Sequence, residues 1–335
     1  MKLPYIIAEI GVNHNGNLNL AIKSIIAAAK SGANAVKFQT FDTNEFMVKG
    51  EHYYTYKTKR GIKKEKMFDM FKRLEVPKSW YKKLVKISKK HKVDFLSSAA
   101  DVSAANLLNK LNVKEIKLSS EDLINYPLLE YVASLGRKTI LSTGMADQKE
   151  VDAAVSIFKA KKTKFALLHC VSVYPTPNVE TNLSRMSALA ERYKVEVGFS
   201  DHTQGIEASI AATAMGALII EKHFTLSRDL IGPDHFISSD PHEFRKLVNG
   251  VRMVYGMMGS KNIVPSPSEQ KSRKHFRRSI VARLDLLKGK KINISDIALK
   301  RPGTGLHPRY FKKIIGKKVK RKILRDKQIS IEDLF

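Results

Sequence analysis

The chain has 335 residues, of which 43% are hydrophobic, and it carries one cysteine and a formal net charge of +28. No run of about 18 apolar residues is present, so no transmembrane helix is expected, and the opening sequence MKLPYIIAEIG lacks the apolar core and cleavage site of a signal peptide. The single cysteine, Cys170, excludes an intrachain disulfide, and together these features predict a cytoplasmic protein.

Up to about residue 262, short runs rich in β-branched residues alternate with longer amphipathic segments. Such alternation is typical of parallel strands joined by crossover helices. Strands are predicted at 5–11, 35–40, 94–99, 115–120, 139–144, 165–171, 195–201 and 218–224. Eight such units in about 250 residues predict a closed (β/α)8 TIM barrel over 1–262. The alternative is a doubly wound open sheet, but the loop GVNHNGN after the first strand does not match its usual G-x-G-x-x-G pattern.

The amino-acid composition changes after residue 262. The segment 263–278 is rich in proline, serine and charge and is predicted to be a linker, and short strand-like runs between Gly and Asn turns predict a small, mainly β domain over 279–335. From Lys271 onward, 21 Lys and Arg residues face only 5 Asp and Glu residues. This charge fits either a nucleic-acid-binding surface or a basic surface that attracts small anionic substrates.

Polar residues gather at the carboxyl ends of the predicted strands, where the active sites of this barrel lie. Lys37 and Lys117 each stand inside an apolar run, with acidic residues on neighbouring strands. A single buried lysine is more often part of an ion pair, but two at matched strand ends favour a site for phosphate or carboxylate groups.

His202 and His223 follow the seventh and eighth strands, so their imidazoles can converge on one point. Imidazoles with carboxylates nearby suit a divalent transition metal, and Glu9 and Glu221 can complete the shell directly or through water. A structural role for both histidines stays open, because no HxH or HExxH motif marks the pair.

Several motifs together resemble the bacterial sialic acid synthases, which make N-acetylneuraminate and its relatives legionaminate and pseudaminate. The motifs are IIAEIGVNHNG, AVKFQT, LSTGM, LLHC…YPTP, GFSDHT, IEKHFTL…GPDH and KRPGTG, and they occur in order along nearly the whole chain. The resemblance implies a (β/α)8 barrel followed by an antifreeze-like (SAF) domain. It also implies a cytoplasmic transferase that condenses phosphoenolpyruvate with N-acetylmannosamine or a related acetamido sugar and releases phosphate.

The resemblance also implies a role for each matching residue. The implied catalytic residues are Glu9 and Glu221, and the implied metal ligands are His202 and His223, with Mn²⁺ favoured and Mg²⁺ or Co²⁺ as alternatives. The implied phosphoenolpyruvate contacts are Lys37, Ser98, Lys117, Ser120, Ser172 and Ser200. The implied sugar contacts are Gln39, Asp122, Tyr174, Asp234 and Arg301. Arg301 matches an arginine that reaches the partner subunit's site, which implies a domain-swapped homodimer.

The sequence departs from the family pattern around the substrate. The third strand ends SSAA (97–100) where STPF is usual, SSED replaces GSGE after Lys117, and Ser172 replaces a common asparagine. Counting back from Tyr126 makes Asp122, rather than Glu121, the sugar-binding acid. Legionaminate or pseudaminate synthesis, or another phosphoenolpyruvate-dependent condensation, therefore remains an alternative. A nucleic-acid-binding role is the non-enzyme alternative, and the basic region lacks the interleaved aromatic residues that would support it.

Overall fold

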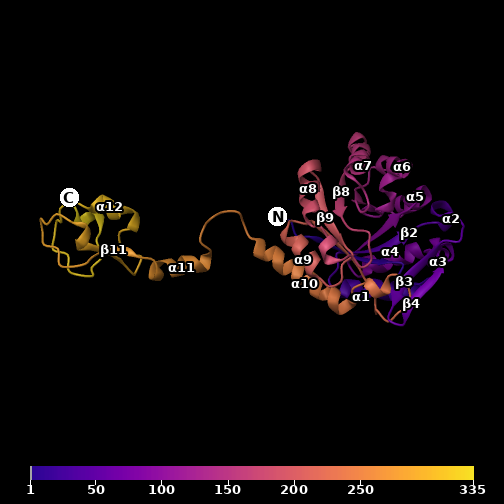
Figure 1. Cartoon of the computed structure of the whole chain (residues 1–335), viewed down its shortest axis with the longest axis horizontal. Coiled ribbons are helices and arrows are strands. Elements are labelled where there is room, and N and C mark those ends of the chain that lie inside the picture. Colours follow the sequence, from indigo (N-terminus) through magenta and orange to yellow (C-terminus); the bar gives the residue numbers. More distant parts are fainter. Residues whose placement is uncertain (1) are drawn as a thin grey trace. The chain divides into compact units, whose positions relative to one another are not determined.

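The chain divides into two compact units, the first ending at Gly259 and the second running from Ser260 to Phe335. The computed structural model describes residues 2–335 (Figure 1). Among those residues, no helix combines the length and the apolar character that a membrane span requires.

The first unit is a closed barrel of eight parallel strands, which confirms the predicted fold and rules out the open sheet. Around the barrel the strands follow the order β1-β10-β9-β8-β7-β6-β5-β2. Their bounds are β1 Tyr5–Gly11, β2 Ala35–Thr40, β5 Asp94–Ala99, β6 Ile116–Leu118, β7 Thr139–Ser142, β8 Phe165–His169, β9 Glu196–Asp201 and β10 Ile219–His223. Each predicted strand is present, and the differences are confined to one or two residues at the strand ends.

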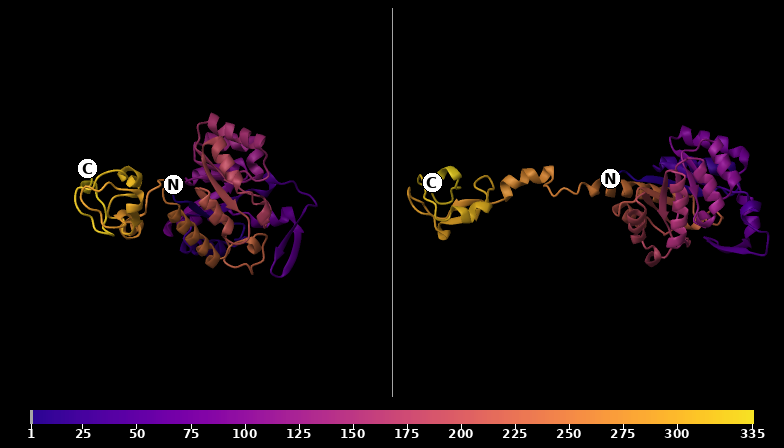
Figure 2. Two further views of the ribbon diagram at one scale, coloured as in Figure 1. Left: turned by 60° about the vertical axis from the view of Figure 1, so that its left-hand side comes forward. Right: turned by 90° about the horizontal axis from the view of Figure 1, so that it is seen from above.

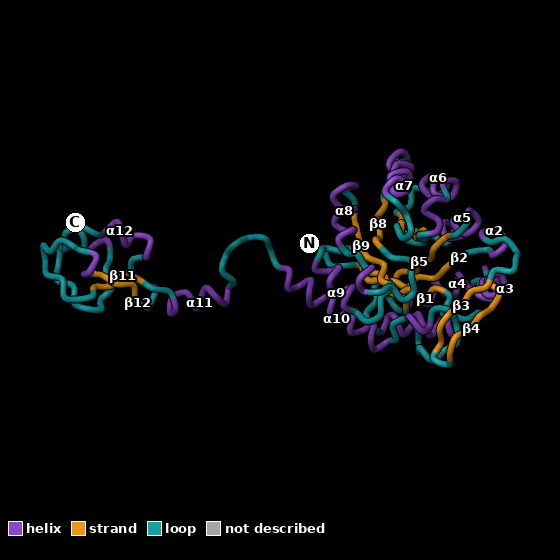
Figure 3. The backbone as a smooth tube through the Cα atoms, viewed as in Figure 1, coloured by secondary structure: helices purple, strands orange, loops and turns teal. Residues whose placement is uncertain are grey.

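Helices surround the barrel strands, as the purple and orange tubes of Figure 3 show. The main helices are α1 Leu18–Lys30, α4 Tyr81–Lys90, α5 Val102–Lys110, α6 Tyr126–Ser134, α7 Gln148–Ala160, α8 Ser184–Tyr193, α9 Glu207–Ala214 and α10 Pro241–Met258. Local signals set their starts: Asn17 caps α1, and Asp147 and Glu150 form a capping box on α7. The buried face of α1 carries Ala21, Ile25 and Ala28, so small and branched side chains pack against the strands.

Side chains alternate between the inside and the outside of the barrel along each strand, which divides the apolar core into two layers and positions the site. Inside the barrel a small apolar cluster fills the lower part, formed by Ile7, Ala35, Leu96, Ile140, Ala166, Leu168 and Ile219. The larger cluster lies between the strands and the helices. Because side chains alternate along a strand, the residue two positions after Ile219 faces the lumen again, and this residue is Glu221. Charged groups therefore enter the lumen directly above its apolar floor.

An antiparallel hairpin between the second and third barrel strands was not predicted. It consists of β3 (Tyr53–Thr58) and β4 (Gly61–Lys66), follows the short helix α2 (Thr43–Phe46) and leads into α3 (Met67–Leu74). The hairpin lies at the edge of the first unit in both views of Figure 2.

The second unit has its own apolar core. It contains the antiparallel pair β11 (Ser279–Ala282) and β12 (Ile297–Lys300), several isolated bridges and the short helix α12 (Phe311–Ile314). Its core residues are Ile280, Ala282, Leu286, Ile292, Ile297, Leu306, Ile314, Val319, Ile323, Ile329 and Leu334. The segment predicted as a linker contains helix α11 (Pro267–Phe276), none of whose residues is buried.

Candidate active site

A pocket of about 540 Å³ opens at the carboxyl ends of the barrel strands. This volume lies within the usual range for small-molecule sites. Eleven of the fifteen predicted site residues line it, namely Glu9, Lys37, Gln39, Lys117, Ser120, Ser172, Tyr174, Ser200, His202, Glu221 and His223. The structure thus brings together residues from six strands or the loops that follow them.

A buried ion cluster forms the centre of the pocket. The ammonium group of Lys37 lies 3.0 Å from Glu9 Oε2 and 3.7 Å from Glu221 Oε2, and all three side chains are at most 6% exposed. Their strands explain the contact, because Glu9 and Lys37 are register partners on β1 and β2. A buried charge is costly unless it is paired, and here one cation lies between two acids.

The two carboxyl groups of this cluster differ in acidity. Burial raises the pKa of Glu9 to about 7, although Lys37 opposes the shift. Burial also tends to raise the pKa of Glu221, but Lys37, Lys117 and the hydroxyl of Ser200 together hold it below its usual value. Ser200 Oγ donates to Glu221 Oε1 at 2.9 Å. One acid can therefore exchange a proton near neutral pH while the other stays ionised.

Lys117 of β6 provides a second buried amine in the pocket, separated by one strand from β2, which carries Lys37. Its ammonium group donates to Ser142 Oγ and to the carbonyl oxygen of Leu118. Burial lowers its pKa from the usual lysine value, with Glu221 opposing the shift. Ser98, which does not line the pocket, is 4% exposed and is the register partner of Lys117. An anionic ligand would supply the compensating charge that this amine lacks.

A cluster of small polar groups adjoins Lys117. Ser120 Oγ lies 3.1 Å from Cys170 Sγ and accepts a hydrogen bond from the amide of Gly144. A Cβ atom at position 144 would lie 2.4 Å from Ser172 Oγ and 2.8 Å from Ser120 Oγ. Only glycine therefore lets these hydroxyl groups converge on the same part of the pocket.

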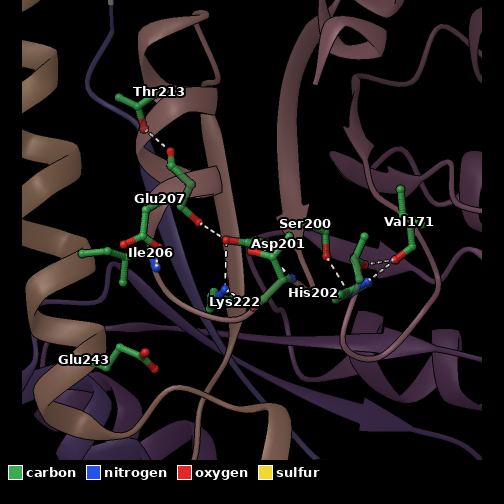
Figure 4. Close-up of polar contacts among 12 residues, drawn as sticks. Val171, Ser200, Asp201, His202, Ile206, Glu207, Thr213, Lys222 and Glu243 are labelled. Atoms are coloured by element: carbon green, nitrogen blue, oxygen red, sulfur yellow. Dashed lines mark hydrogen bonds and ion pairs between the residues drawn. The ribbon is translucent and has the colours of Figure 1, made fainter. Parts of the chain in front are cut away.

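The two predicted metal ligands lie side by side. The ring centroids of His202 and His223 are 5.6 Å apart, and the ring of Tyr174 lies 4.3 Å from that of His202. His202 Nδ1 is 2.8 Å from the carbonyl oxygen of Val171, which can only accept, so this nitrogen carries the proton (Figure 4). Burial lowers the pKa of both histidines, so both rings are neutral at physiological pH.

These two rings fit a divalent transition metal. Neutral imidazoles are its usual ligands, and the bond of His202 to a carbonyl is the arrangement that orients a metal-binding ring. His223 Nδ1 is buried, has no hydrogen-bond partner in the described part of the chain, and lies 3.6 Å from Asp234 Oδ2. Within residues 2–335, no group of three or more His, Cys, Asp or Glu side chains is arranged to hold a metal ion. A cation held by these two imidazoles would take its other ligands from water or substrate.

The side chain of Asp234 approaches Glu9 and Gln39 at Gly11. The backbone of Gly11 has a φ angle of +52°, and a Cβ atom there would lie 3.0 Å from Glu9 Oε1, 3.4 Å from Gln39 Nε2 and 3.6 Å from Asp234 Oδ2. Three predicted site residues thus meet over a position that only glycine can occupy. Burial raises the pKa of Asp234 to about 6.

The acidic pair after β6 is placed differently from the expectation. Both residues lie on the short 3₁₀ helix Glu121–Ile124, and it is Glu121 that lines the pocket. Asp122 is 7% exposed, and its Oδ2 atom makes no hydrogen bond among the described residues. Burial raises the pKa of Asp122 to about 8, and Glu121 adds to the shift.

The remaining predicted residue, Arg301, belongs to the second unit. There its guanidinium group lies 5.4 Å from the ring centroid of Phe276.

Eight pocket residues are not among the fifteen predicted site residues, namely Tyr54, Met67, Ser119, Glu121, Ser142, Met145, Cys170 and Val173. Tyr54 lies on the hairpin β3–β4, which contacts the loop after β10 through Lys59 and Asp229 at 2.7 Å and through Lys57 over the ring of Phe236. The run YYTYKT has strong β-propensity and could have indicated a strand beside the pocket.

Comparisons with known proteins agree with the fold. The chain matches the NeuB family model over residues 24–263 and the SAF domain model over residues 277–334. It is 40% identical to N,N'-diacetyllegionaminic acid synthase of Campylobacter jejuni, over 95% of this chain and 96% of that protein. It is 31% identical to pseudaminic acid synthase of Helicobacter pylori, over 100% of this chain and 98% of that protein. The crystal structure of N-acetylneuraminic acid synthetase from Leptospira borgpetersenii in complex with citrate has a TM-score of 0.74 and 39% identity, and covers 80% of this chain and 90% of that one.

Replacing Asp122 by asparagine tests the environment of this acid. Its raised pKa means that the folded state keeps a proton that the unfolded state loses, so its contribution to stability is present below about pH 4 and is lost as the pH rises through about 8. We compare the free energy of unfolding of Asp122→Asn with that of the unaltered protein. We expect the difference to shift in favour of the variant by at least ~1 kcal/mol when the pH is raised from 4 to 8. Urea unfolding at both pH values measures this change. A difference in stability that does not vary with pH would contradict the assignment.

Proposed function

The chain belongs to the NeuB family, and on that premise we propose that it is a phosphoenolpyruvate-dependent synthase of a nonulosonic acid. The family match confirms the resemblance to sialic acid synthases that the sequence motifs indicated. The substrate class is an acetamido sugar: N-acetylmannosamine would give N-acetylneuraminate, and a diacetamido trideoxy sugar would give a legionaminate or pseudaminate. The enzyme is then a transferase that forms a carbon–carbon bond.

One observation carries this proposal. Two buried lysines, Lys37 and Lys117, reach the same pocket as the neutral pair His202 and His223. Phosphoenolpyruvate carries a phosphate and a carboxylate, which the amines and nearby hydroxyl groups can compensate. The imidazoles provide a separate position for a metal, and a sugar aldehyde can bind beside it.

In the proposed reaction, C3 of phosphoenolpyruvate attacks the aldehyde carbon and a new carbon–carbon bond forms. The aldehyde oxygen takes up a proton, which protonated Glu9 can donate, and becomes a hydroxyl. C2 is left electron-deficient, and the ionised carboxylate of Glu221 stabilises it. Water then adds to C2 and gives up a proton, which Glu9 can accept because its pKa is about 7. The bond from C2 to the phosphate oxygen breaks, inorganic phosphate leaves, and C2 becomes a ketone.

We propose that Mn²⁺ is the metal and that His202 and His223 hold it. When bound, such a cation supplies Lewis acidity toward the aldehyde oxygen of the sugar. Gln39, Tyr174, Asp234 and one acid of the pair Glu121 and Asp122 would orient the sugar. The orientation of His202 by the carbonyl oxygen of Val171 supports this role, because the ring presents its unprotonated nitrogen away from that bond.

We also propose a domain-swapped homodimer in which Arg301 serves the pocket of the partner subunit. A guanidinium group supplies several donors in a fixed geometry, which suits the oxygen atoms of an acetamido sugar. The SAF match over residues 277–334 supports the assignment of Arg301 to this separate module.

Phosphate release tests the function directly. The protein is incubated with phosphoenolpyruvate, Mn²⁺ and one of three sugars: N-acetylmannosamine, its 6-phosphate or a diacetamido trideoxy hexose. We expect stoichiometric release of phosphate with at least one sugar, and a product mass equal to the sum of the substrates plus water minus phosphoric acid. Release that needs no sugar, or none with any member of the panel, would contradict the proposal.

Removing either imidazole tests the metal position. We expect His202→Ala and His223→Ala each to lower turnover by at least ~100-fold, because the loss of a ligand removes several kcal/mol of transition-state stabilisation. Circular dichroism and thermal melting should stay near those of the unaltered protein. His242→Ala, at an exposed position on α10, is the matched control. Near-normal turnover in either pocket variant would exclude the pair as metal ligands.

Arg301→Ala tests the swapped domain. We expect the KM for the sugar to rise much more than the KM for phosphoenolpyruvate, and Arg309→Ala, in the same unit, to change neither. Co-expression of Arg301→Ala with His223→Ala separates the two arrangements. If Arg301 acts on the partner's pocket, each mixed dimer contains one intact site, and about a quarter of all sites are active. No recovery of activity would place Arg301 and His223 in the same subunit's site.

A further inference from the structure

A second buried ion pair lies behind the pocket, on the outer face of the barrel. Lys222 of β10 and Asp201 of β9 point toward one another, with Lys222 Nζ 2.9 Å from Asp201 Oδ2 (Figure 4). Their side chains are 2% and 0% exposed. Neither residue lines the pocket, and the proposed reaction uses neither of them.

The pair is the centre of a network around one short loop. Asp201 Oδ1 accepts hydrogen bonds from the amide and hydroxyl of Thr203, at 2.9 and 2.7 Å, and Asp201 Oδ2 accepts from Ser209 Oγ at 2.6 Å. Lys222 Nζ donates to the carbonyl oxygen of Thr203 at 2.6 Å. The residues on both sides of His202 are therefore bound to this network, while the ring of His202 faces the pocket.

The pair lies at the carboxyl ends of β9 and β10, next to both histidines. The backbone pairing between β9 and β10 begins at Phe199 and Ile220 and ends at Asp201 and Lys222. His202 and His223 are each the next residue of their chains. His223 stays paired with Glu9 on the other side of β10, and the carbonyl oxygen of His202 accepts a hydrogen bond from the amide of Thr176. Between β9 and β10 themselves, the side chains of Asp201 and Lys222 form the last link before the two histidines.

The stability of the barrel alone does not require a charged pair at this position. Buried ion pairs can often be replaced by apolar side chains of similar volume without loss of stability, because the cost of desolvation offsets their attraction. On β9 and the residue after it, Ser200 and His202 face the pocket, and Asp201 between them faces outward. On β10, Glu221 and His223 face the pocket, and Lys222 between them faces outward. The charged pair occupies the outward position between the inward-facing residues of both strands.

We propose that the Lys222–Asp201 pair is a positioning device that fixes the spacing and orientation of His202 and His223. This inference rests on the proposed function, since it assigns the pair to the metal position of that site. The role is a positioning one, because neither side chain touches the pocket.

The test is the double variant Lys222→Met with Asp201→Asn. It removes both charges together, conserves volume, and leaves an amide that can still accept from Thr203, so no unpaired charge is buried. We expect it to remain folded, with a melting temperature within about 5 °C of the unaltered protein. Binding of Mn²⁺ to the metal-free protein, measured by electron paramagnetic resonance titration, should weaken by ~10–100-fold.

A control lies at the other end of the same strand. Lys138 pairs with Glu196, the first residue of β9, at 2.6 Å, and with Glu115. Lys138→Met therefore removes a partly buried ion pair of the same barrel without touching the ends of β9 and β10 that carry the histidines. We expect it to bind Mn²⁺ as the unaltered protein does. Equal affinity in the folded double variant and in this control would overturn the proposal.

A second measurement does not depend on metal. Nitrogen-15 spectra of labelled histidine report which ring nitrogen carries the proton, and in the unaltered protein His202 should be protonated at Nδ1 because it donates to Val171. The double variant should show a mixture of tautomers for His202. If the unaltered protein binds no Mn²⁺, the proposed metal site is wrong, and this spectrum alone decides the positioning role. An unchanged tautomer in the double variant would overturn that role.

Discussion

The pocket depends on the burial of a lysine between two carboxylates. Lys37 has almost no access to water, and only Glu9 and Glu221 make its charge tolerable inside the barrel. This arrangement makes the two acids unequal: the pKa of Glu9 rises to about 7, and that of Glu221 stays below its usual value. The same constraint leaves the pocket receptive to anions, because Lys117 has hydroxyl and carbonyl partners but no carboxylate within ion-pair distance among the described residues. Charge balance, more than shape, therefore defines what the pocket can hold.

Strand alternation gives the two faces of the barrel different tasks. On β10 the sequence Glu221-Lys222-His223 places an acid and an imidazole in the lumen and an ammonium group outside. On β9 and the residue after it, Ser200-Asp201-His202 repeats the pattern with the opposite outer charge. The inner residues meet substrate in the proposed reaction, and the outer pair joins the two strands where their backbone ladder ends. This explains how three polar residues can follow an apolar strand with no turn between them: Glu221 and Lys222 each pair on their own side of the sheet, and His223 faces the pocket.

The sequence predicted the barrel well because its signal is strong. Runs such as YIIAEIG and AVKFQT are β-branched and apolar, and alternation then assigns their polar residues to the lumen. Other features carried weaker signals. The second strand of the hairpin, Gly61–Lys66, is mostly exposed and lysine-rich, and only Tyr54, Tyr56 and Thr58 of the first strand face inward. Tyr54 reaches the pocket only through tertiary contacts. Helix α11 was assigned to a linker because no apolar stripe marks it, although Ser266, Pro267 and Glu269 form a recognisable helix start. Which of Glu121 and Asp122 faces the pocket depends on a single turn of 3₁₀ helix, and counting along the sequence cannot determine that orientation.

The proposed chemistry requires His202 and His223 to hold one divalent cation beside the two lysines. Crystals of the protein soaked in Mn²⁺, with diffraction recorded near the manganese absorption edge, locate such a cation. We expect a single strong anomalous peak within coordination distance of both imidazoles, on the same side of the barrel as Lys37 and Lys117. A peak elsewhere, with these two rings free of metal, would contradict this expectation.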